Sequence, residues 1–351
     1  MKIRNALYLA VIIHFIVTVY NNAYAFDPCE FPDHVEIEVD LFYDIIPKQS
    51  FFRDSLFGSE RANRSEMKLI VNLPRTIKKR QEITKLEFEP LPSRLFIENG
   101  NKYAEYILPL PKVNTRLKIH IEAKTYRYDL ATAINDPNKR LFDDSNLDLY
   151  LQHERMIEKD DPIIQDIAES LQGKTDLDIV KNIYKYVILN LSFDLSKLKG
   201  VGAVRTAQTK TGMCIDYCDL FVALCRAKNI PARVVAGYKP YFYASPKHSW
   251  VEVYFKEYGW VPFSVTISNK VPEEILHQLF YNVKAPCMRF TSLRNDDLLH
   301  NNYFYFYPYW DKKFRKNIKS LTESIEFKKP LSKQHDSLKD IERARKAGHI
   351  K

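Results

Sequence analysis

The chain has 351 residues, of which 45% are hydrophobic and 28% are charged. This composition is typical of a folded globular protein and excludes a low-complexity chain, and the length allows more than one domain. The formal charge of +9 is concentrated near the C-terminus, because residues 311–351 hold 13 Lys or Arg against 6 Asp or Glu. The rest of the chain is close to neutral, which argues against a nucleic-acid-binding protein. We expect 311–351 to be a basic, solvated and partly helical extension, with contact to an acidic surface as the alternative.

The N-terminus carries the pattern of an export signal. Two basic residues precede an apolar run of about 15 residues, and an Ala-x-Ala pattern ends at Ala25. We predict that residues 1–25 are a signal peptide, against the alternative of an uncleaved anchor. No later segment is apolar enough to be a transmembrane segment, so we expect an exported protein, periplasmic or secreted. Its five cysteines are an odd number, which leaves at least one thiol unpaired, and Cys29 and Cys287 are a candidate disulfide pair.

Residues 26–150 are dominated by strand patterns. Apolar and charged side chains alternate in "VEIEVDLFY" (35–43) and again in "LKIHIEAKTYRY" (117–128). A period of two with one polar face is typical of half-buried antiparallel strands. The pair Asn99-Gly100 stands between two apolar runs and predicts a hairpin. We therefore predict a β-rich, β-sandwich-like N-terminal domain over 26–150.

Helical patterns begin near residue 150. Asp161 and Pro162 supply a cap and a first-turn proline to one predicted helix, and a second helical pattern covers 175–191. A third follows Gly212 and ends near Asn229. Because strand patterns come next, we predict an α+β domain over 151–310.

The strands of this domain are predicted at 233–238 and as a hairpin within 247–266 that turns near Tyr258-Gly259. An aromatic run, residues 303–310, predicts a further strand that closes the sheet. The alternative for this run is an aromatic wall that faces a substrate.

Cys214 begins the third predicted helix. A thiol is a nucleophile only as the thiolate, and a helix N-terminus lowers the thiol pKa through its dipole and unpaired N–H groups. The same N–H groups can stabilise an oxyanion. Cys218 and Cys225 lie further along the apolar side of the helix and are better interpreted as core residues. A core role is also the alternative for Cys214.

His248 can supply the base that a thiol nucleophile needs. In its strand, Val251, Val253 and Phe255 share one face, so His248 and Glu252 point to the other. Ser264, in the returning strand, also belongs to the face of His248. The thiol of Cys214 and the imidazole of His248 would then form a thiolate–imidazolium ion pair, and the helix dipole would stabilise the thiolate.

At this point the chain resembles the transglutaminase-like superfamily of papain-related cysteine enzymes. The resemblance covers about residues 155–266 and rests on "GMCIDYCDLFVALCRAKNIPARVVAGY" and "HSWVEVYFKEYGWVPFSVT", in the family's order and spacing. The preceding helices and the β domain also resemble secreted bacterial members, less specifically. The resemblance implies a papain-like, transglutaminase-like core of helices packed on an antiparallel sheet.

By the same resemblance, Cys214 is the nucleophile and His248 its general acid and base. The family's reaction is attack on a carboxamide or peptide carbonyl to form a thioester, which an amine or water then accepts. A protein or peptide substrate is therefore implied, and we favour hydrolysis over cross-linking because water is the default acceptor. We expect no cofactor and no metal, since the histidines show no ligand spacing.

Ser264 departs from the family pattern. It stands where the family usually has the Asp of Asp-Pro-Thr, which accepts a hydrogen bond from the imidazole. A charge-assisted hydrogen bond contributes roughly 1.5–3 kcal/mol and a neutral one about 1 kcal/mol, so serine weakens the base without abolishing it. The alternative hypothesis is a catalytically weak or inactive transglutaminase-like fold that serves as a binding or assembly module.

Overall fold

The computed structural model describes residues 34–48, 66–142, 146–194, 200–239, 247–267, 271–283, 287–299, 309–310 and 317–328. These stretches belong to one compact unit that begins at His34. The predicted signal peptide, residues 1–25, lies outside the described residues, and so does Cys29.

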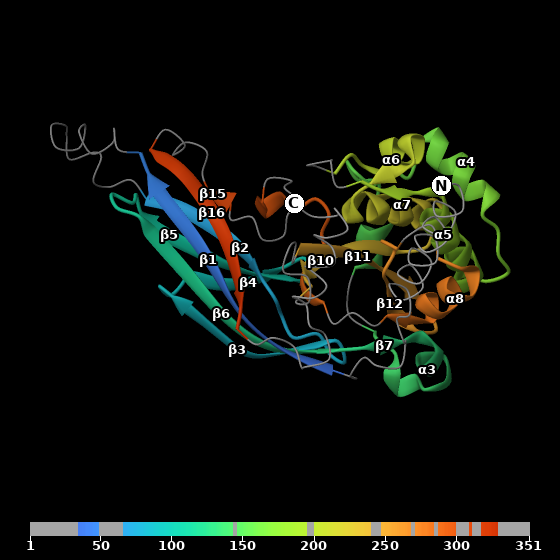
Figure 1. The fold of residues 1–351 in the computed structure, drawn as a ribbon, viewed down its shortest axis with the longest axis horizontal. Helices are drawn as coiled ribbons and strands as arrows, with labels where there is room; N and C mark the ends of the chain where they lie inside the picture. Colours follow the sequence, from blue (N-terminus) through green and yellow to red (C-terminus); the bar gives the residue numbers. More distant parts are fainter. Residues whose placement is uncertain are drawn as a thin grey trace, which may run out of the picture. The chain divides into compact units, whose positions relative to one another are not determined.

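Two four-stranded antiparallel sheets form the first part of the unit (Figure 1). Their core is shared, because alternate side chains of β1 and β6, such as Leu41 and Ile119, meet alternate side chains of β2 and β5, such as Val71 and Tyr106. This arrangement is a β-sandwich. One sheet has the order β16-β1-β6-β3 and the other β15-β2-β5-β4, with β1 (His34–Pro47), β2 (Glu66–Leu73), β3 (Gln81–Glu89), β4 (Arg94–Glu98), β5 (Asn101–Pro109), β6 (Thr115–Tyr126), β15 (Tyr309–Trp310) and β16 (Ile318–Phe327).

The predicted hairpin at Asn99-Gly100 is confirmed. Asn99 has φ 47° and Gly100 has φ 74°, and Glu98 pairs with Asn101 across the turn between β4 and β5. Two consecutive residues with positive φ are the requirement of the tight hairpin turn that Asn-Gly favours.

β16 differs from the sequence expectation. Residues 318–327, expected in a solvated and partly helical extension, form a strand that pairs along β1 from Val39 to Pro47. The physical reason is that β1 offers an edge of unpaired backbone groups, and alternate side chains of β16 are half-buried against it. Glu323 of β16 also accepts hydrogen bonds from Tyr238 (2.6 Å) and Lys247 (2.7 Å), so β16 touches both β10 and β11.

The aromatic run contributes β15, whose Tyr309 and Trp310 pair with Ile70 and Leu69 of β2. The predicted strand therefore exists at the end of the run, but it extends a sandwich sheet and not the sheet of the α+β part. Residues 300–308 lie outside the described residues.

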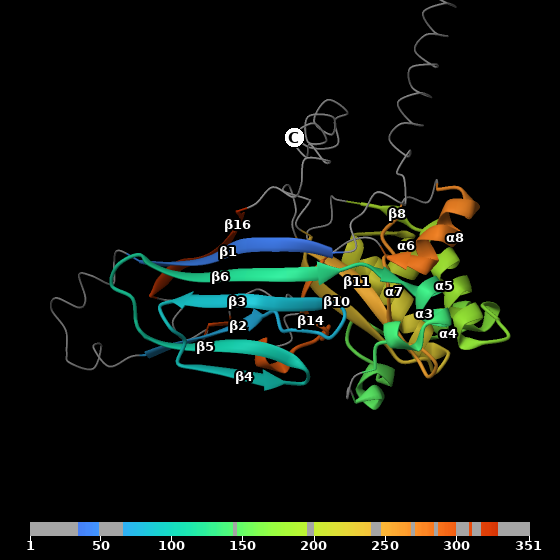
Figure 2. The same ribbon diagram turned by 90° about the horizontal axis from the view of Figure 1, so that it is seen from below.

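The second part of the unit is an antiparallel sheet covered by helices, which confirms the α+β class. Helix α7 lies at the centre, packed against α4, α5, α6, β10 and β11. In Figures 1 and 2, β10 and β11 lie between the sandwich strands and these helices. The sheet order is β12-β11-β10-β14. The elements are α4 (Pro162–Ser170), α5 (Asp176–Asn190), α6 (Ala203–Thr209), α7 (Cys214–Ala227), β10 (Ala232–Tyr238), β11 (Lys247–Phe255), β12 (Gly259–Phe263), α8 (Glu273–Tyr281) and β14 (Met288–Thr291).

The predicted helix starts are confirmed by their caps. The Asp161 side chain accepts a hydrogen bond from the Ile163 N–H, with Pro162 in the first turn of α4. Thr175 and Asp178 form a reciprocal capping box at α5. Short elements complete the structure: β7 (Tyr128–Asp129), α3 (Leu130–Asn135), η2 (Pro137–Lys139), η3 (Leu147–Leu151), β8 (Ser192–Phe193), β9 (Thr211–Gly212), β13 (Asn282–Val283) and η4 (Asp297–Leu299).

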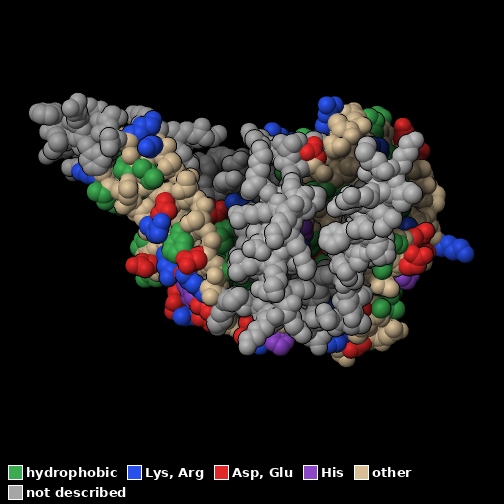
Figure 3. All heavy atoms as spheres, in the orientation of Figure 1, with side chains coloured by type: hydrophobic (Ala, Val, Ile, Leu, Met, Phe, Trp, Pro, Cys, Tyr) green, Lys and Arg blue, Asp and Glu red, His purple; other side chains and the backbone are tan. Residues whose placement is uncertain are grey.

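The surface and the helices add two observations. Acidic and basic side chains are interspersed over the part of the sandwich that is described and visible in Figure 3. Within the described ranges, no helix has both the length and the apolar character that a membrane span requires.

Candidate active site

Cys214 is the first residue of α7, and the chain before it is fixed by Asp216. The Asp216 carboxylate accepts hydrogen bonds from the N–H of Met213 (2.9 Å) and of Val201 (2.6 Å). Gly212 packs directly on this side chain, since a Cβ at Gly212 would lie 2.5 Å from the Cβ of Asp216. The helix start is therefore held by side-chain capping and by a close approach that only glycine allows.

The thiol of Cys214 lies against Ser249 of β11. Burial raises the pKa of the Cys214 thiol, and the nearby Asp216 carboxylate raises it further. Hydrogen bonds from the backbone and hydroxyl of Ser249, and from the backbone of Ile215, lower the pKa but do not compensate. The protonated thiol is therefore favoured at neutral pH.

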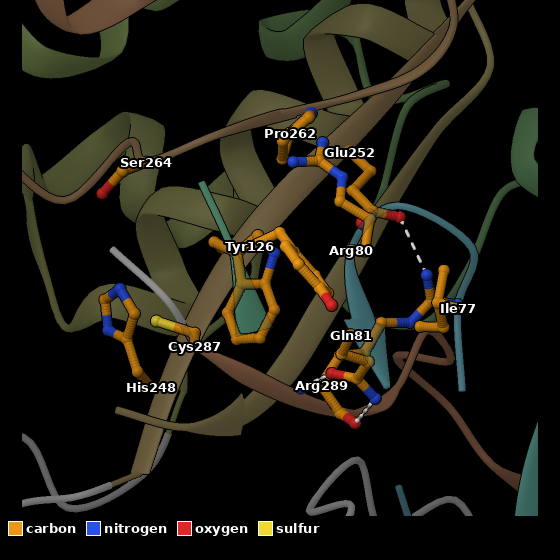
Figure 4. Close-up of a pocket in the computed structure, with 11 residues that line it drawn as sticks. Ile77, Arg80, Gln81, Tyr126, His248, Glu252, Pro262, Ser264, Cys287 and Arg289 are labelled. Carbon is orange, nitrogen blue, oxygen red and sulfur yellow. Dashed lines mark hydrogen bonds and ion pairs between the residues drawn. The ribbon is translucent and has the colours of Figure 1, made fainter. Parts of the chain in front are cut away.

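β11 and β12 present two different faces, as the alternation predicts. Val251, Val253 and Phe263 are buried in the core that contains α7. His248 and Ser264 line a cavity on the opposite face of the sheet (Figure 4). The register of the hairpin is fixed by the pairing of Val251 with Phe263, so that Ser264 directly follows the last paired residue.

The imidazole of His248 is also biased toward its neutral form. Burial lowers the pKa of His248 to about 3, with a further contribution from the positive charge of Lys239. Its ring lies nearly parallel to that of Trp250, at 6.2 Å between ring centroids. The thiolate–imidazolium pair expected from the sequence is thus disfavoured in this structure, because burial penalises both charges.

The structure places Cys214 beside β11 but outside the cavity of His248, because Cys214 is not among the described residues that line it. Cys214 contacts Ser249, the immediate neighbour of His248 in the chain. His248 shares its cavity with Ser264. Cys218 and Cys225, expected to be core residues, are fully buried in the helical core.

Glu252 shares the cavity but is already engaged by arginines. Its Oε2 atom accepts from Arg233 at 2.7 Å and 2.8 Å and from Arg289 at 3.1 Å. Burial acts to raise the pKa of Glu252, but Arg289, Arg233 and Arg80 outweigh it and the pKa is lowered. Glu252 is therefore an ionised carboxylate that pairs with arginines, and it does not replace the family's Asp as a partner of His248.

Comparison with known proteins shows what this part of the chain is similar to. Residues 165–265, which include Cys214, His248 and Ser264, match the profile of the transglutaminase-like superfamily. These residues are similar to a transglutaminase-like domain.

Two curated bacterial relatives are similar to parts of the chain. The uncharacterised protein YebA of Bacillus subtilis is 42% identical over 73 residues, which are 17% of this chain and 10% of YebA. An uncharacterised Haemophilus influenzae protein is 23% identical over 266 residues, 62% of this chain and 72% of its own length. The chain thus matches about a tenth of YebA and most of the Haemophilus protein.

A solved structure shows that the fold extends beyond the transglutaminase-like domain. The crystal structure of a candidate cysteine protease from Cytophaga hutchinsonii covers 87% of this chain and 96% of its own, with a TM-score of 0.51 and 17% identity. At this identity the likeness concerns the fold alone.

Several cavity residues carried no signal in the sequence. Arg80, Gln81 and Tyr126 come from the sandwich part of the chain, Cys287 directly precedes β14, and Arg289 lies in β14. They lie far from the transglutaminase-like motifs in sequence, so only the folded chain brings them to His248. Among the described residues, no three His, Cys, Asp or Glu side chains are grouped as a metal site requires.

Cys287 is the most unexpected of these residues. Figure 4 shows its sulfur directed toward the side of the cavity where His248 lies. Burial raises the pKa of its thiol to about 11. The four described cysteines form no disulfide with one another, and the candidate partner Cys29 lies outside the described residues.

Proposed function

We propose that this chain is an exported cysteine hydrolase that cleaves an amide or peptide bond, with Cys214 as nucleophile and His248 as general acid and base. The observation that carries the proposal is the position of Cys214. It begins α7 and contacts Ser249, which directly follows His248 in β11, within the segment that matches the transglutaminase-like superfamily. Thiol acyl transfer needs a base within reach of the thiol, and His248 is the candidate for that base.

The reaction begins from neutral groups. As Cys214 Sγ bonds to the carbonyl carbon, its proton passes to the imidazole of His248, and the carbonyl electrons form an oxyanion. Backbone N–H groups at the start of α7 stabilise that oxyanion. The imidazolium then gives its proton to the leaving nitrogen as the C–N bond breaks, which leaves a thioester on Cys214.

Hydrolysis of the thioester returns the enzyme to its starting state. A water molecule loses a proton to the neutral imidazole of His248 and attacks the thioester carbon. The C–S bond breaks, the thiolate regains the proton and a carboxylic acid is released. In this scheme Ser264 accepts at most a neutral hydrogen bond from His248, so the imidazolium is stabilised less than in a family member with Asp.

The test is cleavage of a complex peptide mixture, followed by mass spectrometry. We expect cleavage by the wild type and by Cys218→Ala, a matched control that removes a buried thiol one turn along α7. Cys214→Ala and His248→Ala should cleave nothing and should still fold. A fluorescent primary amine added to the mixture separates hydrolysis from cross-linking, because only a cross-linking enzyme incorporates it.

The second candidate is a binding or assembly module without catalysis. The neutral thiol and imidazole, together with Ser264 in place of Asp, favour it. This candidate predicts no cleavage by the wild type and an unchanged biological role for Cys214→Ala. Cleavage that persists in Cys214→Ala would instead refute Cys214 as the nucleophile.

A further inference from the structure

The cavity beside His248 contains more buried positive charge than its carboxylate can balance. Arg233 and Arg289 are 2% and 6% exposed, and both donate to the single Oε2 atom of Glu252. Arg80 lies close enough to lower the pKa of the same carboxylate. Among the described residues that line the cavity, Glu252 is the only carboxylate. Three guanidinium groups therefore share one carboxylate, and two of them, Arg80 and Arg289, line the cavity.

The positive charge of Arg80 is balanced by the fewest interactions of the three. Its Nε and Nη2 atoms are buried and have no hydrogen-bond partner among the described residues. Its guanidinium lies 3.9 Å above the centre of the Tyr128 ring, which holds the group in place. Burial lowers the pKa of Arg80 and of Arg289 to about 10, so both stay charged at neutral pH. Buried charges in proteins are normally paired, and this excess calls for an anion.

The rest of the cavity suits a small anionic group that is bonded to an apolar carbon. Its volume is about 50 Å³, and Ile77, Trp250 and Pro262 give it apolar walls. Gln81 anchors the floor, because its side-chain amide donates to the Arg289 carbonyl (2.9 Å) and accepts from the Arg289 N–H (2.8 Å). A planar guanidinium matches the two oxygens of a carboxylate.

The two ends of the cavity have different chemistry. Figure 4 shows His248 and Ser264 at one end, and Arg80, Gln81 and Arg289 at the other. A substrate whose scissile amide lies at His248 would direct its neighbouring groups toward the arginines. We infer that the arginine end is a subsite for a substrate carboxylate, held by Arg80 and Arg289, so that the substrates are peptides with a carboxylate next to the scissile bond. This assignment of substrate class rests on the proposed hydrolase function.

The test compares peptides that differ only in charge. One pair has a free C-terminal carboxylate or a C-terminal amide, and a second pair has Glu or Gln beside the scissile bond. Binding is measured by calorimetry on the folded Cys214→Ala protein, and cleavage is measured on the wild type. We expect one carboxylate form to bind and react about 10- to 100-fold better than its neutral twin, because charge-assisted hydrogen bonds are lost in the twin. The pair that responds identifies the carboxylate as terminal or as a side chain.

Variants then assign the effect to the arginine end. Arg80→Gln should abolish the preference for the carboxylate, and Arg80→Lys should keep part of it. Arg116→Gln, which removes an exposed sandwich arginine paired with Asp44, should leave the preference intact. Should Arg80→Gln fail to fold, the peptide pairs on Cys214→Ala still decide the question.

The outcomes separate this inference from the proposed function. Equal binding of charged and neutral peptides overturns the subsite, even where the wild type cleaves both. A carboxylate preference in binding without any cleavage supports the subsite and refutes the hydrolase. Displacement of the peptide by inorganic phosphate at concentrations where acetate has no effect would overturn the assignment to a carboxylate.

Discussion

The neutral state of the candidate catalytic pair can be tested by the pH dependence of thiol alkylation. His248 has a pKa of about 3, against an ordinary value of about 6.5. Since one pKa unit corresponds to 1.36 kcal/mol, the protein disfavours the imidazolium by roughly 5 kcal/mol. The pKa of the Cys214 thiol is raised by burial as well. The ion pair should therefore hold a negligible fraction of the resting protein.

The perturbation is pH itself, and the assay is the rate of iodoacetamide labelling at Cys214, read by peptide mapping. At pH 7 we expect Cys214 to react more slowly than an unfolded thiol with a pKa of about 8.5. The rate should fall steadily as pH decreases and should reach a plateau only at a higher pH than that of the unfolded thiol, because only the thiolate reacts and burial raises the pKa of Cys214. Labelling of the urea-unfolded chain supplies the control rate.

A plateau between pH 5 and pH 8 would refute this reasoning. Such a plateau is the signature of a preformed thiolate–imidazolium pair, in which the thiol has already lost its proton to the base. It would mean that His248 and Cys214 stabilise each other's charge by more than burial costs. The mechanism would then begin from the ion pair and not from neutral groups.

Three further substitutions test the site and its support. Ser264→Asp should raise the pKa of His248 and increase kcat/KM in peptide cleavage by roughly 2- to 30-fold, because it replaces a neutral hydrogen bond with a charge-assisted one. An unchanged or lower rate would show that residue 264 does not stabilise the imidazolium. Asp219→Asn removes the carboxylate that the buried Arg294 guanidinium contacts at 2.6 Å and 2.9 Å. The free energy of unfolding in urea should therefore fall by about 3–5 kcal/mol. A loss below about 1 kcal/mol would show that this pair contributes little to stability. Gly212→Ala places a Cβ against Asp216 and should cost about 1–3 kcal/mol in a thermal unfolding measurement, with slower peptide cleavage because Cys214 moves; full stability and activity would show that the helix start is more adaptable than its packing indicates.

The sequence predicted features that depend on local rules. The faces of β11 and β12 follow from the alternation of Val251, Val253 and Phe263, which placed His248 and Ser264 together on the other side. The hairpin at Asn99-Gly100 follows from the backbone conformation that those two residues tolerate. Each of these features depends on only a few neighbouring residues, so it can be predicted from a single sequence.

Features that depend on long-range pairing were missed. β16 forms because β1 offers an edge nearly 300 residues earlier in the chain, and the charge of 318–327 gave no indication of that partner. The arginine end of the cavity combines Arg80 and Arg289, which come from two separate segments of the chain. No motif spacing connects these segments, and only the fold brings their charges together.

Long-range structure also determines the protonation states of Cys214 and His248, and these states are connected to the inferred subsite. A motif indicates that a thiol and an imidazole are near each other, but burial by distant parts of the chain sets their pKa values. The positive charge of Lys239 adds to the effect of burial on His248, because it disfavours the imidazolium. A carboxylate bound at Arg80 and Arg289 would bring a negative charge into the cavity when His248 must take the proton of Cys214. Binding of the correct substrate would then help to stabilise the imidazolium in place of the missing Asp at position 264. On this argument, alkylation of Cys214 at pH 7 should become faster when a non-cleavable carboxylate peptide is bound beside it, and its amide twin should have no such effect.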